Sequence, residues 1–148
     1  MRTLFFAIIT LITLNSCSES DNTPSPFVPV TITPVLIGKG NDISGLTQIS
    51  LKITNQTDWN TLLSSMNTVS NTFAQTTIDF VNYDIIAIID DERPCTNFSI
   101  NIDSITEYEN NITVQYSSSG DINNCFNAVV QPYHIVKIPK SSKPVIFQ

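Results

Sequence analysis

One short apolar run limits the fold of this sequence more than any other feature. Residues 85–89 are five apolar residues in a row, with Asp84 before them and Asp90 after them. A run of this length between polar residues is typical of a strand that is buried on both faces. Residues 48–54 alternate apolar and polar side chains with a period of two, as in a half-buried strand. The sequence therefore predicts a fold dominated by β-strands.

One segment changes to helical spacing. Four apolar residues fall at positions i, i+3, i+4 and i+7: Trp59, Leu62, Leu63 and Met66. This spacing predicts one amphipathic helix near residues 57–67, with Thr57 as the N-cap and Asp58 at its positive end. We therefore expect an α+β fold with β dominant, in which an antiparallel sheet, curled or two-layered, carries one helix. A pure β-sandwich is the alternative.

Turn signals divide the remaining strands. Glycines and polar residues at 38–42 predict a turn. Residues 109–111 separate two alternating segments and predict a hairpin. A loop is expected over residues 117–127, and the last two strands over 133–138 and 145–147.

Residues 1–16 are expected to form a signal peptide. Arg2 precedes an apolar run over residues 4–14. As a helix this run spans about 16 Å, whereas a bilayer core is about 30 Å thick, so the run is too short to cross comfortably. A positive start, a short apolar stretch and a small-residue exit are typical of secretory signals.

The end of this signal resembles the bacterial lipobox. Its residues are Leu14-Asn15-Ser16-Cys17, and in lipoproteins of this kind the signal is cut before the cysteine, whose sulfur is acylated. Glu19 and Asp21 resemble the surface-export signal of Bacteroidetes-type lipoproteins. We therefore expect a lipid anchor on Cys17, an outer-membrane location and display on the cell surface. The periplasmic face, or an ordinary secreted protein, is the alternative.

Residues 17–34 are expected to form a tether between the lipid and a single domain at 35–148. Four of the eight prolines of the chain lie in this stretch. Proline favours extended polyproline-type backbone, so the tether acts as a spacer. Val28, Val30 and Ile32 alternate with other residues and can also form an edge strand.

The composition argues against several classes of function. The formal net charge is −6, whereas a nucleic-acid binder needs a clustered basic surface. A single histidine leaves few routes to multi-histidine metal sites or catalytic triads. The chain contains no Gly-x-Ser-x-Gly nucleophile motif. We expect no enzymatic activity, no cofactor and no metal site.

Four segments resemble, in order, the protease complex subunit PrcB C-terminal-like family. The most distinctive is Gln-Pro-Tyr-His-Ile-Val-Lys-Ile-Pro-Lys at 131–140, and the others lie at 59–62, 79–88 and 93–100. The resemblance implies a small envelope domain that is accessory to a surface protease and does not itself cleave proteins. Thr96 and Asn97 stand where the family has paired glycines, so the loop is expected to differ in shape, because threonine tolerates a left-handed backbone poorly.

Cys95 and Cys125 remain once Cys17 is assigned to the lipid. Two cysteines in an exported chain favour one disulfide, with two free thiols or half of a metal site as alternatives. Arg93, Phe98 and Tyr133 belong to the family motifs, and exposed there they would suit a protein partner. For Phe98 and Tyr133, core packing is favoured over such exposure.

Three further side-chain groups are candidates for a role. Ser104, within Asp103-Ser104-Ile105, resembles a short O-glycosylation motif of Bacteroidetes envelope proteins. His134 is expected to pack and form a hydrogen bond, pointing away from its two chain neighbours. Residues 90–92 are three consecutive carboxylates, expected as a solvated turn, with a calcium site as the alternative.

These features predict a tethered, non-catalytic accessory domain that docks on another envelope protein, for which a protease that it stabilises is one candidate. The docking patch is expected between the 93–98 turn and the 117–127 loop. A protease inhibitor is one alternative. A glycan-binding module is another, for which Trp59 and the four tyrosines are the support.

Overall fold

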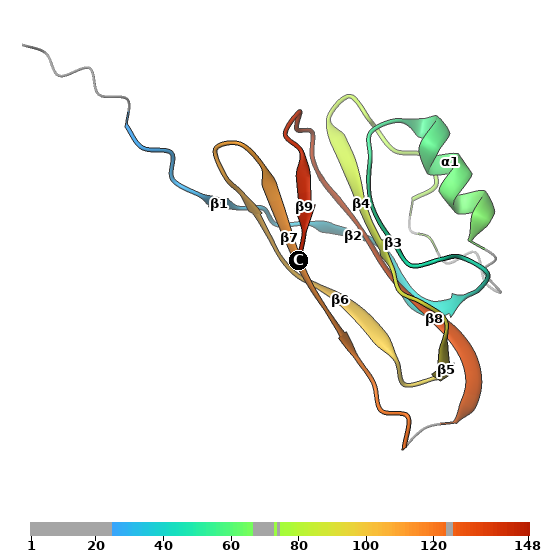
Figure 1. The fold of residues 1–148 in the computed structure, drawn as a ribbon. Helices are drawn as coiled ribbons and strands as arrows, with labels where there is room; N and C mark the ends of the chain where they lie inside the picture. The colour runs from blue at the N-terminus through green and yellow to red at the C-terminus, as the bar shows by residue number, and fades with distance from the viewer. Residues whose placement is uncertain (1–24, 67–72, 74, 124–125) are drawn as a thin grey trace, which may run out of the picture.

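The chain folds into two β-sheets and one helix in the computed structural model, which describes residues 25–66, 73, 75–123 and 126–148 (Figure 1). The first sheet has the order β1-β6-β7-β9, with bounds Val30–Thr31, Ser99–Glu107, Ile112–Ser119 and Val145–Phe147. The second has the order β2-β8-β4-β3, with bounds Val35–Ile43, Asn127–Pro139, Tyr83–Ile89 and Ile49–Ile53. Strand β5, Arg93–Cys95, also pairs with β8 but lies outside this linear strand order. Helix α1 is Gln56–Ser65.

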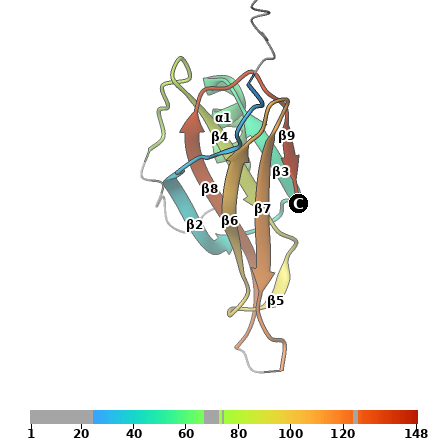
Figure 2. The same cartoon turned by 90° about the vertical axis from the view of Figure 1, so that its left-hand side faces the viewer.

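The second sheet is the middle of three layers. The first sheet covers one of its faces and α1 covers the other, as Figures 1 and 2 show from two directions. The described pairings are antiparallel except that of β7 with β9, which is parallel. The predicted α+β class, with β dominant, two layers of antiparallel strands and one helix, is confirmed.

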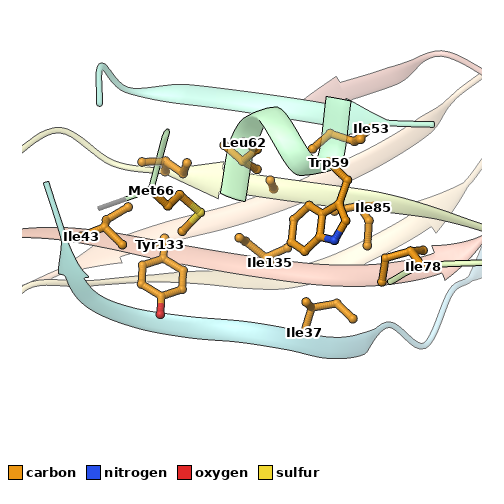
Figure 3. Packing of buried hydrophobic residues seen from close by; sticks show 12 residues of the cluster. Ile37, Ile43, Ile53, Trp59, Leu62, Met66, Ile78, Ile85, Tyr133 and Ile135 are labelled. Carbon is orange, nitrogen blue, oxygen red and sulfur yellow. The ribbon is translucent and has the colours of Figure 1, made fainter. Parts of the chain in front are cut away.

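Strand β4 lies at the centre because both of its faces are apolar. Ile85, Ala87 and Ile89 face the cluster beneath α1, and Ile86 and Ile88 face the cluster between the sheets. All five are buried. Figure 3 shows Ile85 among the residues packed around Trp59 of the helix. The strand predicted from the 85–89 run is confirmed.

Helix α1 uses a different N-cap from the one predicted. Asn55, whose backbone is extended, accepts a hydrogen bond at Oδ1 from the Asp58 backbone N–H (2.9 Å). Thr57 is already inside the helix, so its prediction as the N-cap is wrong. Asn55 stands directly before the first helical residue, and asparagine is at least as good an N-cap as threonine. Met66 is the C-cap, and residue 67 lies outside the described residues.

The turn predicted at residues 38–42 is wrong, because these residues continue strand β2. The strand runs through these residues with two register shifts, at Leu36/Gly38 and Asp42/Ile43. A Cβ on Gly38 would lie 2.7 Å from the Phe73 ring, so the ring requires a residue without a side chain. Glycine here serves side-chain packing rather than a turn.

The hairpin predicted at 109–111 is confirmed by the pairing of β6 with β7. The expected loop is shorter than predicted, because β7 continues to Ser119 and β8 begins at Asn127. Residues 133–138 and 145–147 lie in β8 and β9, as expected.

The last part of the predicted tether lies against the domain. Val30 and Thr31 pair with Glu107 and Thr106, which confirms an edge strand for these two residues. The Nζ of Lys143 lies 4.6 Å from the centroid of the Phe27 ring. The signal peptide at 1–16, Cys17 and tether residues 18–24 lie outside the described residues. Within the described ranges, no helix is long and apolar enough to cross a membrane.

Candidate functional site

The two ends of the molecule differ in position and in surface. We call the end that holds the β6–β7 turn, the start of β4 and the base of the tether the tether end. The opposite end holds β5 and the loop before β8 (Figures 1 and 2). We call its residues 91–98, 120–123 and 126–130 the distal tip.

The distal tip exposes large apolar side chains. Phe126 is 85% exposed, Val129 67% and Ile122 63%. Exposed carboxylates flank them, namely Asp91, Glu92 and Asp121. Single apolar residues on a surface are ordinary, but three within eight residues of one another at one end of a small domain form a candidate contact surface for a protein partner.

An ion pair between the buried Asp90 and the half-buried Arg93 holds the base of the distal tip. Asp90 is 1% exposed and accepts hydrogen bonds from Arg93 Nε (3.0 Å) and Nη2 (2.8 Å). Ser118 Oγ donates to the same carboxylate at 3.1 Å. Burial of Asp90 raises its pKa, but the Arg93 contacts and the Asp91 backbone N–H outweigh burial, so the net pKa is lowered. The prediction that Asp90 belongs to a solvated turn is wrong.

A buried amide ties this base to the second sheet. Gln131, fully buried, donates from Nε2 to the carbonyl oxygens of Asp90 (2.9 Å) and Leu46 (2.5 Å). Its Oε1 accepts from the Leu46 backbone N–H at 3.1 Å. The turn that carries Arg93 is therefore fixed on two sides, because buried polar groups of this kind are costly to leave without partners.

Arg93 and Phe98 lie together, as the predicted docking patch requires. The Cζ of Arg93 is 5.6 Å from the Phe98 ring centroid. Gly120 has φ +150°, and a Cβ there would lie 2.4 Å from the ring. Both side chains are half-buried, so they lie at the base of the distal tip and not among its most exposed residues.

Tyr133 does not lie at this surface. It is 1% exposed, packs with its ring centroid 5.9 Å from that of Phe73 beneath α1, and its hydroxyl lies 3.3 Å from Asp42 Oδ1. Tyr133 and Phe98 therefore do not form an exposed pair, and the core packing favoured from the sequence is confirmed for Tyr133. Alternation along β8 is the reason, because it turns Tyr133 toward the helix layer.

The turn at Thr96 and Asn97 forms without glycine. No non-glycine residue in the described ranges has a positive φ, so neither residue adopts the left-handed backbone. Asn41 Nδ2 donates to the Thr96 carbonyl at 2.8 Å, and Asn97 Nδ2 donates to the Asp121 carbonyl at 2.9 Å. The turn at Thr96 and Asn97 is therefore held by side-chain amides.

The loop before β8 lies on β5. The Thr96 backbone N–H donates to the Phe126 carbonyl at 3.3 Å, and Cys95 pairs with Asn127 across the strands. Cys95 is buried, and its Sγ lies 3.8 Å from the Ile122 carbonyl oxygen. Cys125 lies outside the described residues, so the Cys95–Cys125 disulfide stays a prediction.

The other predicted site residues lie elsewhere. His134 is half-buried between the sheets, where its Nδ1 accepts from the Ile102 backbone N–H at 2.8 Å. Burial first, and then the charge of Lys39, lower the pKa of His134 to about 4, with Asp103 opposing. Ser104 is half-buried on β6 and donates to Gln115 Oε1 at 2.9 Å; its glycosylation stays a prediction.

The described ranges contain no group of three histidine, cysteine, aspartate or glutamate side chains that could hold a metal ion. Both carboxylate oxygens of Asp90 already accept hydrogen bonds, at Oδ1 from Arg93 and at Oδ2 from Arg93 and Ser118. The calcium alternative for residues 90–92 therefore finds no support in the geometry.

Sequence reasoning missed the most exposed residues of the distal tip. Ile122 and Phe126 are the large apolar residues of a sequence segment made mostly of serine, asparagine, aspartate and glycine, and Val129 is the third residue of β8. Their isolation was a usable signal, because a large apolar residue within a polar loop has no obvious core to enter.

Comparison with known proteins gives one match. Residues 85–139, from β4 to the end of β8, match the family model described as PrcB C-terminal. This range contains β5 and the distal tip, but neither α1 nor the tether. No curated protein and no solved structure matches the chain.

Proposed function

We propose that this chain is a surface lipoprotein whose domain is a non-catalytic accessory module, docking through the distal tip on an envelope protease that it stabilises. The observation that carries the proposal is the exposure of Phe126, Ile122 and Val129 at the end opposite the tether. The PrcB C-terminal match supports the choice of a protease as partner.

The position of the tether favours a protein partner over the membrane as the target of the distal tip. Phe27 and β1 hold the chain against the tether end. From Cys17 to Phe27 an extended chain spans at most about 35 Å. The domain therefore stands close to the membrane at one end, and the distal tip points away from it.

Charge agrees with this orientation. The exposed carboxylates Asp91, Glu92 and Asp121 would be repelled by anionic headgroups. At the tether end, in contrast, Lys140 and Lys143 are paired with Asp84 and Glu107. An apolar surface with an acidic rim suits a partner whose apolar pocket has a basic rim.

Anchoring is tested with Cys17→Ser in the full-length chain. We expect the wild-type protein in the outer-membrane fraction and the variant in a soluble or unprocessed form, because acyl chains supply the membrane affinity. Protease added to intact cells should degrade the wild-type domain if it is displayed on the surface. A Cys17→Ser protein that is processed and stays in the outer membrane would contradict lipid anchoring.

Docking is tested by co-purification from the producing bacterium, with a C-terminally tagged full-length chain. Phe126→Ser and Ile122→Ser should lose an envelope protease that the wild type retains. Val81→Ser is the matched control, because Val81 is 83% exposed and lies in the 79–82 turn at the tether end. Loss in the control as well, or retention in all variants, would contradict docking through the distal tip.

The activity of the retained protease separates a stabiliser from an inhibitor. If the domain stabilises its partner, deleting the domain shortens the lifetime of the protease and lowers its activity. If the domain inhibits, deletion raises the activity. The proposal predicts the first result.

A further inference from the structure

A second surface lies at the tether end and has different chemistry. It is a groove of about 520 Å³ on the outer face of the first sheet, beside the β6–β7 turn and the tether. Thr113 of β7 and Ile146 of β9 are partners in register and lie in its floor. No layer covers this face among the described residues, because α1 lies on the far side of the second sheet. We call it the tether-side groove.

Two aromatic side chains stand in the tether-side groove. Phe27 of the tether is 42% exposed and Tyr108 of the β6–β7 turn is 41% exposed. Trp59, on which a glycan-binding reading of the sequence depended, is fully buried beneath α1 and is excluded from any surface role. Of the four tyrosines, Tyr108 is the exposed one. Exposed aromatic faces are the part of a site that stacks on the C–H face of a sugar ring.

The polar lining is rich in side-chain amides, contributed by Asn110, Asn111, Gln115 and Gln148. Asn111 Oδ1 accepts from Thr113 and Gln115 Oε1 accepts from Ser104, which leaves their amide N–H groups as donors. The side chains of Asn110 and Gln148 form no hydrogen bond within the described ranges. A planar amide presents a donor and an acceptor side by side, which matches two neighbouring hydroxyl groups of a sugar.

The charges at the tether-side groove favour a neutral ligand. Glu109 is the charged residue in the lining. The nearest cation, Lys143, is held by the Glu107 carboxylate at 2.8 Å and the Tyr108 carbonyl at 2.7 Å, so it is not free to bind a phosphate. A carboxylate and amides around aromatic rings bind hydroxyl groups and repel anions.

The backbone beneath the tether-side groove is fixed. The Tyr108 N–H donates to the Asn111 carbonyl at 2.8 Å and closes the β6–β7 turn. The Gln148 N–H donates to the Val114 carbonyl at 2.9 Å, and its carbonyl accepts from the Tyr116 N–H at 3.0 Å. The backbone of the β6–β7 turn and of Gln148 is therefore held before a ligand binds, which lowers the entropic cost of binding.

We propose that the tether-side groove binds a neutral saccharide, with Tyr108 and Phe27 stacking on the ring and the amides holding its hydroxyl groups. Its volume lies within the range of small-molecule sites. Because the groove lies on an exposed sheet face, we expect dissociation constants on the order of 1 mM. The site is separate from the distal tip, so a domain docked on a protein through that tip keeps the groove open.

The test is a ¹⁵N NMR titration of the full soluble chain (residues 18–148) with neutral hexoses, N-acetylhexosamines and their short oligomers. The expected result is a saturable shift of the side-chain amide signals of Asn110, Asn111 and Gln148, with no shift at Phe126. Inorganic phosphate is the control ligand and should give no shift there.

Variants assign the binding to the tether-side groove. Tyr108→Ala and Asn110→Ala should each weaken saccharide binding at least about tenfold, while Asn60→Ala, an exposed asparagine of α1, should leave it unchanged. An unchanged melting temperature shows that the variants are folded. No saturable shift with any of the sugars, a response to phosphate, or binding that survives both groove variants would overturn the proposal. None of these results depends on the fate of docking at the distal tip.

Discussion

Two buried aspartates lie near the two ends of strand β4, Asp84 as its second residue and Asp90 just after its last, and they are neutralised in different ways. Asp84, at the tether end, lies between Lys52 (3.3 Å) and Lys140 (2.7 Å), which come from distant segments. Asp90, at the distal tip, is paired with Arg93, three residues along the same turn. Asp84 thus joins separate elements, whereas Asp90 shapes its own turn.

The difference shows how the distal tip is built. Because Arg93 is held by Asp90 and covers Phe98, the base of the distal tip is rigid and its charge is neutralised locally. The residues beyond it, Phe126 and Ile122, stay exposed. At the tether end, ion pairs instead fix β3 and the segment after β8 around Asp84. One end holds the domain together, and the other presents a surface.

Removing each aspartate in turn should have the greatest effect on stability. Asp84→Ala should lower the free energy of unfolding by about 3–5 kcal/mol, because Lys52, mostly buried, is left without its carboxylate. Asp90→Ala should cost less, about 1–3 kcal/mol, because the partly exposed Arg93 can be hydrated. Urea unfolding measures both, with Asp91→Ala as the exposed control. Equal losses for Asp84→Ala and Asp91→Ala would contradict the assignment.

The predicted Cys95–Cys125 disulfide would stabilise the distal tip by linking the end of β5 to the loop before β8, in addition to the Asp90–Arg93 ion pair. Replacing both cysteines by serine should destabilise the domain by about 3–4 kcal/mol in the loop-entropy account for a loop of roughly 30 residues. The measurements are the melting temperature and the mobility on a non-reducing gel. Unchanged mobility and melting temperature in the double variant would count against the bridge.

Acid should lower the free energy of unfolding of the domain through protonation of His134, which lies in β8 between the two ends of the molecule. Its folded pKa of about 4 lies below the ordinary 6.5, so the unfolded chain binds the proton first as pH falls. Stability is therefore complete above about pH 6.5 and declines toward pH 4, by up to about 2 kcal/mol once solvent screening is allowed for. His134→Asn keeps an acceptor for the Ile102 N–H and should flatten this slope in urea unfolding from pH 7 to 4. If the pH dependence of the unfolding free energy is unchanged in His134→Asn, groups other than His134 cause it.

The smallest stability effect belongs to the exposed residues of the distal tip. Phe126→Ser should change the free energy of unfolding by less than about 0.5 kcal/mol, because its side chain has no core contact to lose. Val81→Ser, equally exposed, should behave the same way. A large loss for Phe126→Ser would mean that the side chain is structural and would remove it from the docking surface.

Features that depend on local periodicity could be predicted from the sequence. The 85–89 run, the helical spacing from Trp59 to Met66 and the hairpin at 109–111 all appear as expected. Each depends on neighbours a few residues away, which a single sequence contains. The layered arrangement followed from the presence of one helix among many strands.

Features that depend on distant partners could not be predicted. Gly38 signalled a turn, but the reason for it is the Phe73 ring, 35 positions away along the chain. The sequence predicts a solvated Asp90, but its buried carboxylate accepts a hydrogen bond from Ser118 of β7, 28 positions away along the chain. Tyr133 lies in the segment that resembles a family motif, but the motif does not say which face of the sheet the side chain occupies. The register of β8 decides this. At the distal tip, exposure of Phe126 follows from the path of a loop whose shape no short pattern encodes.

The most direct test of the account is site-specific photo-crosslinking in intact cells. A photoreactive amino acid replaces Phe126 at the distal tip or Val81 at the tether end of the full-length chain, two positions of similar exposure. We predict that position 126 gives a discrete cross-linked product containing an envelope protein, and that position 81 gives none. A product from position 81 alone, or from neither position, would contradict the assignment of the distal tip as the docking surface.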